Sequence, residues 1–231
     1  MIDQVSDDVK TEQWIRGLKI LSTFVVVAAI FLAGYAFWMK KQESKTLQAF
    51  SSLAEADVIE MRALRDVKVL SQDPVEALRD GPAAQKSAYV AALEKVRAEH
   101  HGTTASVLAA LRLGRWFIQN NDLAKAESIY KDVLGEIRGR DSDVYVSMAS
   151  EALGVVYEDQ NRLDEALKIY NSALTNDKAT LRPLLLLGKA RVLSSMKKPT
   201  EAKTVYDIVV EDYPNSAYSQ QARALAVKAE L

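Results

Sequence analysis

The hydrophobic and polar positions along the chain follow two different patterns. From Ile20 to Met39 the sequence is apolar and carries no charge, whereas from about residue 42 apolar residues recur every three or four positions. A helix rises about 1.5 Å per residue, so the uncharged segment would span roughly 30 Å, the thickness of the hydrocarbon core of a bilayer. Tyr35 and Trp38 lie near its end, where amphipathic rings favour the membrane interface. The pattern predicts an N-terminal tail at 1–19 and a transmembrane helix at 20–39.

A cleaved signal peptide and a buried core helix are the alternatives for this segment. The apolar region of a signal peptide is usually about 7 to 15 residues long, and the small residues from Gly34 to Ala36 lie inside the apolar run. Unbroken apolar stretches in core helices rarely exceed about 14 residues, so a retained anchor fits better. The flanking charges leave the orientation open, because three basic residues stand on each side. They are Lys10, Arg16 and Lys19 before the segment, and Lys40, Lys41 and Lys45 after it.

The rest of the chain has the pattern of continuous helix. Proline occurs at only five positions and strand-like alternation is nowhere sustained, which predicts an all-α fold. We expect residues 42–102 to hold a long juxtamembrane helix and an atypical first helix pair, with a second helix from about 83 to 99 that ends at His100-His101-Gly102. The long helix carries one apolar stripe between residues 42 and 70. The stripe consists of Leu47, Phe50, Leu53, Ala54, Val58, Met61, Leu64 and Val67.

An internal repeat follows. Gly114 precedes Ala126 by twelve residues, Gly154 precedes Ala166 by the same number, and a third, more degenerate copy comes after them. The order L-G-x-x-F/Y, then A-x-x-x-Y, then P resembles the signature of the tetratricopeptide repeat. The signature positions are Leu113, Gly114, Phe117, Ala126, Tyr130, Leu153, Gly154, Tyr157, Ala166, Tyr170, Ala190, Ala202, Tyr206 and Pro214.

This signature implies an α-solenoid of about three to four antiparallel helix pairs. We expect repeats at about 107–140, 147–180 and 183–216 within a domain at 103–231, closed by a C-terminal capping helix. The aligned alanines lie 40 and then 36 residues apart, so insertions relative to the ideal period are expected in the loops between repeats. Contacts such as that of Gly114 with Ala126 would let the paired helices approach, and the aromatic positions would fill the space between successive pairs.

The first helix of each pair would line the concave face of the solenoid. The residues expected there are Leu108, Leu111, Arg115, Ile118, Met148, Glu151, Val155, Glu158, Leu184, Leu187, Arg191 and Ser194. This mixed surface, apolar with a few opposite charges, suits an amphipathic helix or an extended segment of a protein partner. The alternative is that these residues pack against the long helix at 42–70, which would leave the groove partly filled by the chain itself.

The composition narrows the chemistry further. The chain has no cysteine and a net charge of −1, which excludes disulfides and thiol nucleophiles and gives no overall field for steering nucleic acid. His100-His101 does not suit a metal, because adjacent side chains point in different directions. Glu151 and Glu158 lie two turns apart, which favours a partner-facing stripe over a catalytic acid pair. We therefore expect no enzyme activity, no cofactor and no metal.

The organisation of the chain resembles a known family. A short tail, one membrane helix, a long juxtamembrane helix and degenerate tetratricopeptide units, with the stretch TASVLAALRLGRWFIQNNDLAKA from Thr104 to Ala126, resemble the ancillary subunit of the bacterial Sec translocon. The resemblance implies a single-pass protein of the bacterial inner membrane whose repeat domain faces the periplasm. It also implies association with translocon subunits and contact with periplasmic chaperones or emerging secreted chains. The family has no catalytic residues.

A different class of function is a structural assembly factor. Such a protein would form a homodimer through the long helix at 42–70 and bridge complexes of the cell envelope. It predicts that this helix self-associates, whereas the translocon interpretation predicts that Arg115 and Glu151 lie close to foreign chains.

Overall fold

The computed structural model of the protein describes residues 31–61, 83–136, 142–176 and 179–229. All regular structure in these ranges is α-helical. The expected tail at 1–19 and the first part of the expected membrane helix, residues 20–30, lie outside the described residues. The chain divides into two compact units, Met1–Gln48 and Ala49–Leu231.

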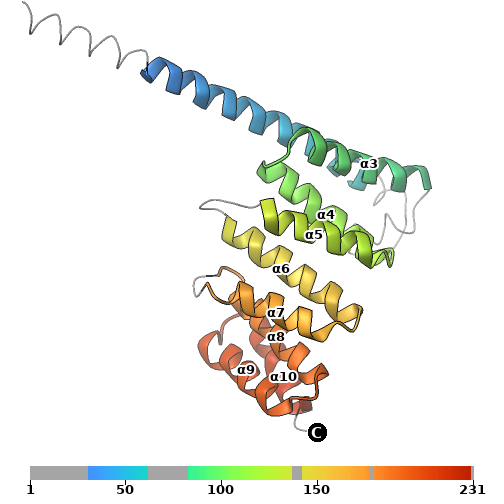
Figure 1. Cartoon of the computed structure of the whole chain (residues 1–231), viewed down its shortest axis with the longest axis vertical. Helices are drawn as coiled ribbons and strands as arrows, with labels where there is room; N and C mark the ends of the chain where they lie inside the picture. The colour runs from blue at the N-terminus through green and yellow to red at the C-terminus, as the bar shows by residue number, and fades with distance from the viewer. Residues whose placement is uncertain (1–30, 62–82, 137–141, 177–178, 230–231) are drawn as a thin grey trace, which may run out of the picture. The chain divides into compact units, whose positions relative to one another are not determined.

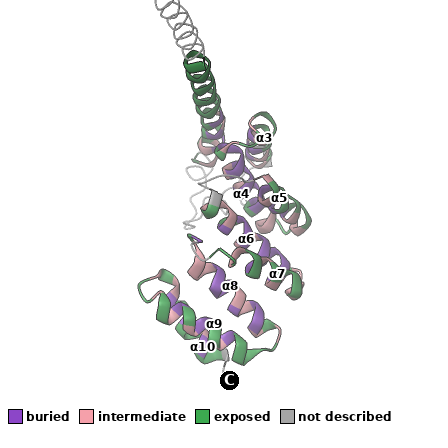
Figure 2. Ribbon diagram, turned by 60° about the vertical axis from the view of Figure 1, so that its left-hand side comes forward, coloured by how far each residue is buried: buried purple, intermediate pink, exposed green. Residues whose placement is uncertain are grey.

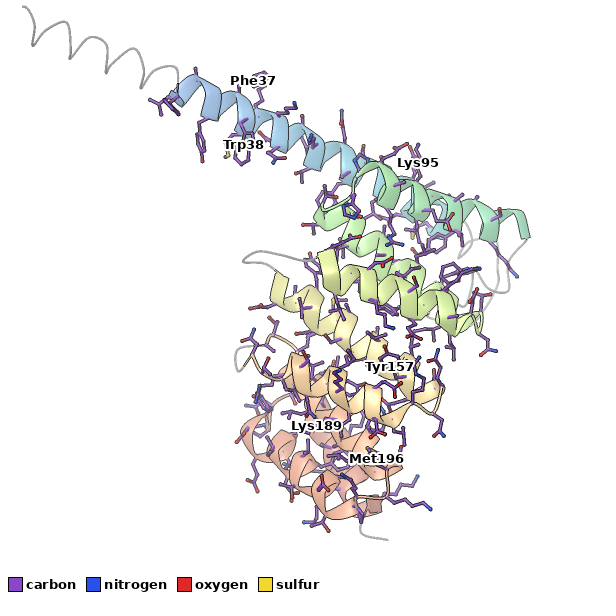
Figure 3. The ribbon with its side chains drawn as sticks, viewed as in Figure 1. Phe37, Trp38, Lys95, Tyr157, Lys189 and Met196 are labelled. Atoms are coloured by element: carbon purple, nitrogen blue, oxygen red, sulfur yellow. The ribbon has the colours of Figure 1, made fainter. Side chains whose placement is uncertain are left out.

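The described part of the first unit is a helix with an apolar surface. Residues 31–48 are helical, and the side chains of Phe31, Leu32, Phe37 and Trp38 are all more than half exposed. Figure 3 shows Phe37 and Trp38 projecting from this helix. The rings of Tyr35 and Trp38 lie with their centroids 6.1 Å apart. Among the described helices, none combines the length and the hydropathy that crossing a membrane requires.

The second unit is a stack of antiparallel helices in the order of the sequence (Figure 1). Residues 49–61 form its first helix. The next helices are α3 (Ala83–Glu99), α4 (Thr104–Gln119), α5 (Leu123–Glu136), α6 (Ser142–Asp159), α7 (Leu163–Ala173), α8 (Arg182–Ser195), α9 (Pro199–Asp212) and α10 (Ala217–Ala229). The pairs α4–α5, α6–α7 and α8–α9 correspond to the three expected repeats, so the all-α repeat architecture is confirmed.

The turn inside each pair has the same backbone conformation. Asn121, Asn161 and Lys197 adopt φ of 59°, 57° and 59°, the left-handed region that lets the chain reverse in few residues. They are spaced 40 and 36 residues apart, like the aligned alanines. Asp122 caps α5 by accepting a hydrogen bond from the amide of Lys125 at 3.3 Å, and Pro199 begins α9.

The interior of each pair differs in one respect from the sequence interpretation. Ala126, Ala166 and Ala202 are fully buried, as their position in the signature requires. The residue that fills the space in front of Gly114, however, is Tyr130, whose ring would lie 2.5 Å from a Cβ atom at that position. The close contact that the structure shows at Gly114 is therefore a glycine–tyrosine contact, because the ring reaches across to the facing helix.

The aromatic positions accordingly divide between two tasks. Tyr130 fills its own pair, donates a hydrogen bond to the carbonyl of Leu111 on α4 at 3.4 Å, and also lines a groove together with residues of α6 in the next pair. Tyr170 lies against both Gly154 in its own pair and Gly188 in the next. Tyr157, labelled in Figure 3, contacts cationic groups of two pairs, with Arg162 at 4.4 Å and Lys131 at 5.8 Å from its ring centre.

The helix at 49–61 packs with a face that the sequence analysis selected only in part. Ala49, Leu53 and Ala56 are buried, while Asp57 pairs with Arg112 of α4. Leu53 belongs to the expected stripe, whereas most other described members of that stripe are exposed. Its members Leu47, Phe50, Val58 and Met61 are 64%, 42%, 49% and 63% exposed. Figure 2 shows the buried and exposed faces of this unit. Ala49 and Ala56 let this helix approach its neighbours closely, so small residues mark its buried face.

The last helix covers the end of the stack. The expected capping helix at about 216–228 is α10, which packs against α9 and α8. Ser219, Ala222 and Ala226 are buried there, and Leu225 packs beside them. A terminal helix of this kind shields the apolar face that the last pair would otherwise expose.

Candidate partner-binding groove

One groove lies across the first helices of the three pairs. Helix α6 contacts both α4 and α8, so these helices lie side by side on one face of the stack. The groove has a volume of about 610 Å³. Its lining residues are Leu111, Arg115, Ile118, Tyr130, Val144, Met148, Glu151, Ala152, Val155, Leu181, Leu184 and Tyr218. Aliphatic side chains dominate this surface, with one guanidinium and one carboxylate among them.

Most of the residues selected from the sequence meet in this groove. Those that line it are Leu111, Arg115, Ile118, Met148, Glu151, Val155 and Leu184. Most of the residues chosen from α4 and α6 are correct, because the signature glycines of both helices fix which helical face each residue occupies. Leu108 instead packs against the buried core, and Ser194 lies outside the groove.

The selection fails on α8. Leu187 is only 1% exposed and belongs to the core, so its expected place on the concave surface is wrong. The physical reason is that α8 contacts α6, α7, α9 and α10, which buries it on nearly every side. Leu185, Leu186 and Leu187 are consecutive buried residues. A helix that is apolar all round gives no reliable exposed face in the sequence pattern.

Glu158 and Arg191, also expected in the groove, are engaged with each other. Arg191 donates hydrogen bonds to the carboxylate of Glu158 from Nε at 2.6 Å and from Nη2 at 2.7 Å. The hydroxyl of Tyr170 donates to the same carboxylate at 2.9 Å. The Glu158 hydrogen bond raises the pKa of Arg191, and burial, followed by the charge of Glu158, raises the pKa of Tyr170. These groups connect the second repeat to the third and are not among the residues that line the groove.

Glu151 stands in contrast to this pair. Its side chain lies in the groove among Met148, Ala152 and Val155 of the same helix. Burial raises the pKa of the Glu151 carboxyl, and the charge of Arg191 only partly opposes that effect, while the charge of Glu158 adds to it. Within the part of the chain that the structure describes, no donor forms a hydrogen bond to this carboxylate. Glu151 is thus a partly desolvated acid in an apolar surface.

Several lining residues were missed by sequence reasoning. Val144, Ala152 and Leu181 lie beside selected positions and could have been found from a wider helical face. Tyr130 was assigned to the core by its place in the signature, although its edge also reaches the groove. Tyr218 comes from α10, and no periodic signal in the sequence places the capping helix beside the groove.

The self-filled alternative finds no support in the described residues. None of the groove-lining residues belongs to the helix at 49–61. That helix contacts α3, where Glu55 pairs with Lys95 at 3.8 Å, and α4, where Asp57 pairs with Arg112. Its Ser52 also lies 3.1 Å from His100, just after α3. Residues 62–70 of the expected long helix lie outside the described residues.

The described residues offer no alternative chemistry at a metal. Among them no group of three or more metal-ligating side chains comes together. The two histidines point to separate partners, since His100 contacts Ser52 and His101 lies 2.8 Å from Glu136.

A stack of antiparallel helix pairs whose first helices share a grooved face defines an α-helical repeat scaffold. The tetratricopeptide repeat-like domain matches residues 12–230 of the sequence. The chain belongs to this family, whose repeat domains are typically non-catalytic and imply protein partners.

Comparison with solved structures agrees with this fold. The chain is similar to a tetratricopeptide repeat protein from Parabacteroides merdae ATCC 43184, with a TM-score of 0.54 and 13% sequence identity. The match covers 78% of this chain and 60% of that chain. At this identity the similarity shows the fold alone. No curated protein matches the sequence.

Proposed function

We propose that this protein is a membrane-anchored scaffold for protein–protein interaction that acts as an ancillary subunit of the protein-export translocon. The repeat domain would lie in the periplasm of a bacterium, held at the inner membrane by residues 20–39. Its partners would be translocon subunits and periplasmic chaperones or emerging secreted chains. The specific role rests on the resemblance carried by Thr104–Ala126 and by the order of the segments.

The proposed anchor is supported by the apolar sequence and by its exposed side chains. The segment from Ile20 to Met39 carries no charge over a length suited to a bilayer. Its described portion, residues 31–39, is helical and leaves Phe31, Phe37 and Trp38 exposed. Apolar side chains of this size are stable in lipid and unfavourable in water.

The groove across α4, α6 and α8 is the observation that carries the proposal. It combines a largely aliphatic lining with a single carboxylate and a single guanidinium, which suits a segment of a folded or nascent chain. An anchor at the membrane would raise the effective concentration of the groove near a membrane complex, so a modest intrinsic affinity would suffice.

Site-specific crosslinking in membranes tests the groove. A photoreactive residue placed at Met148, which lies in the groove and is 40% exposed, should capture foreign chains that include translocon subunits or exported proteins. The matched control is the same residue at Lys168, which is exposed on α7 and does not line the groove. Equal capture at both positions would argue against a specific surface on the concave face.

A reporter fusion tests the location. Alkaline phosphatase fused after Leu231 should be active, because that enzyme requires export from the cytoplasm. A cytoplasmic reporter at the same position should then be inactive. The reverse pattern would contradict the periplasmic location while leaving the scaffold function open.

A second candidate function is self-association, favoured by the exposed stripe on the helix at 49–61. We define this stripe as Phe50, Val58 and Met61. Their spacing puts them on one face, and contiguous exposed apolar residues of this kind mark interaction sites. Two copies of the stripe could pack as a short helix pair in a homodimer that bridges envelope complexes.

Sedimentation of the full-length chain tests this candidate. Replacement of Phe50 and Met61 by Glu should convert a dimer to a monomer, because two facing charged stripes cannot desolvate together. Ile208→Glu, at an exposed apolar residue of α9, is the control and should leave the dimer intact. A wild-type chain that is monomeric at every concentration would exclude this candidate.

A further inference from the structure

The half-buried carboxylate of Glu151 gives the groove a chemical preference. We infer that the groove selects a protein segment carrying a lysine or arginine between apolar side chains, and that Glu151 on α6 receives this basic group. The inference rests on the proposed function of the groove and adds the class of segment that it binds.

The first argument is the position of Glu151 within the groove. Met148 and Val155 lie about one turn before and after it on α6, and Leu184 of α8 lines the same space. A segment that places one side chain at Glu151 therefore sets its neighbouring side chains against aliphatic groups. This arrangement matches a basic residue flanked by apolar ones.

The second argument is hydrogen bonding. Glu158, two turns further along α6, accepts hydrogen bonds from Tyr170 at 2.9 Å and from Arg191 at 2.6 Å. Glu151 accepts none within the described residues, although much of its side chain is removed from water. A partly desolvated carboxylate gains from a charge-assisted hydrogen bond, and one from an ammonium or guanidinium is among the strongest in proteins.

The third argument concerns the charges around Glu151. The groups that act on it are Arg191 on α8 and Glu158 on its own helix, and Arg115 of α4 lines the same groove. Arg191 already uses Nε and Nη2 for Glu158, so its charge is largely balanced there. The charge of Arg115 also acts on Tyr89 and Tyr130, whereas it is not among the groups that shift the pKa of Glu151. The position beside Glu151 thus favours an added cation.

Synthetic peptides presented to the full-length chain test this inference. The probe is a short amphipathic peptide of leucine, alanine and serine with one central position occupied by Lys, Arg, Gln, norleucine or Glu. Calorimetry should show the Lys and Arg peptides binding about tenfold or more tightly than the Gln and norleucine peptides, in line with one charge-assisted hydrogen bond. The Glu peptide should bind least well.

Two variants of Glu151 assign the preference. Glu151→Gln, which preserves the shape of the side chain, should remove the advantage of Lys and Arg while the norleucine peptide still binds. Glu151→Lys should reverse the order in favour of the Glu peptide. Glu211→Gln, at an exposed position of α9, should change nothing. Circular dichroism establishes that each variant is folded.

The other outcomes separate the inference from the function beneath it. Binding of all peptides with equal affinity, unchanged in Glu151→Gln, overturns the preference and leaves the groove as an apolar binding surface. Failure of every peptide to bind overturns both the preference and the groove as a peptide site. A peptide-free dimer that Glu151→Lys dissociates would show that a second copy occupies the groove, which also overturns the inference.

Discussion

Arg191 of α8 holds the carboxylate of Glu158 of α6 with two hydrogen bonds, 2.6 Å and 2.7 Å long. The Nη2 atom of Arg191 also lies 3.3 Å from the hydroxyl of Tyr170, which itself donates to Glu158. The side chain of Glu158 is only 13% exposed, so solvent screens this network weakly. The three residues therefore join the second repeat to the third through polar contacts beneath the groove.

Removal of Glu158 should destabilise the stack. Glu158→Ala is expected to cost about 1.5 to 3 kcal/mol, because it leaves Arg191 and Tyr170 without their shared acceptor. The free energy of unfolding from urea denaturation measures the effect, and a double-mutant cycle with Arg191→Met should give a clear coupling energy. Asp207→Asn is the control, since the exposed Lys203–Asp207 pair at 3.4 Å should contribute less than about 1 kcal/mol. Additive single effects would contradict the network.

The glycine–tyrosine contact should make Gly154 intolerant of a side chain. A Cβ atom at Gly154 would overlap the ring of Tyr170, and the ring cannot withdraw because Gly188 lies against its other side. Gly154→Ala is expected to lower the free energy of unfolding by about 1 to 3 kcal/mol through overpacking. Gly135→Ala provides the control, because a Cβ atom there meets nothing within 4 Å and alanine is the better helix former. Thermal melts of the two variants should move in opposite directions.

The repeat geometry was predictable from the sequence because it depends on local constraints repeated at a fixed spacing. The polar turns, the buried Ala166 and the start of α9 at Pro199 follow from residue types whose backbone preferences are narrow. The partner of Gly114 was not predictable in the same way. The signature requires a small residue at position 114, and only the structure shows that the ring of Tyr130 occupies the space in front of it.

Parts of the candidate site were less predictable, for physical reasons that differ between helices. On α6 the polar residue Glu151 interrupts an apolar face, so periodicity locates the groove. On α8 both faces are apolar, so Leu187 could not be distinguished from an exposed residue. On the helix at 49–61 the predicted stripe was based mainly on large apolar side chains. It omitted Ala49 and Ala56, whose small size allows the helix to pack against the rest of the unit.

Relief of backbone strain at Lys197 should stabilise the third repeat. Lys197 has φ of 59°, whereas the equivalent positions of the first two repeats hold Asn121 and Asn161. A lysine in the left-handed region is strained by roughly 1 kcal/mol, which glycine avoids and asparagine reduces. Lys197→Gly and Lys197→Asn are expected to raise the free energy of unfolding by up to about 1 kcal/mol. Asn161→Val, measured by the same denaturation, should lower it.

The titration of Glu151 should make the stability of the domain depend on pH. Burial raises the pKa of its carboxyl above the ordinary value of 4.5 in the folded chain. Between that ordinary value and the folded pKa, the folded state binds more protons than the unfolded state, so stability falls as pH rises through this range. The groups that face Glu151 are Arg115, Tyr130, Glu158, Tyr170 and Arg191.

Comparison with Glu151→Gln isolates this contribution from that of the other acids. The variant lacks the titrating group, so its melting temperature should exceed that of the wild type at pH 7 and approach it near pH 4. Scanning calorimetry across this pH range measures the difference. Glu211→Gln, at an exposed glutamate of α9, should show a small and nearly constant difference. A Glu151→Gln difference that does not grow with pH would mean that water or a hydrogen-bond donor already satisfies the carboxylate in the folded chain.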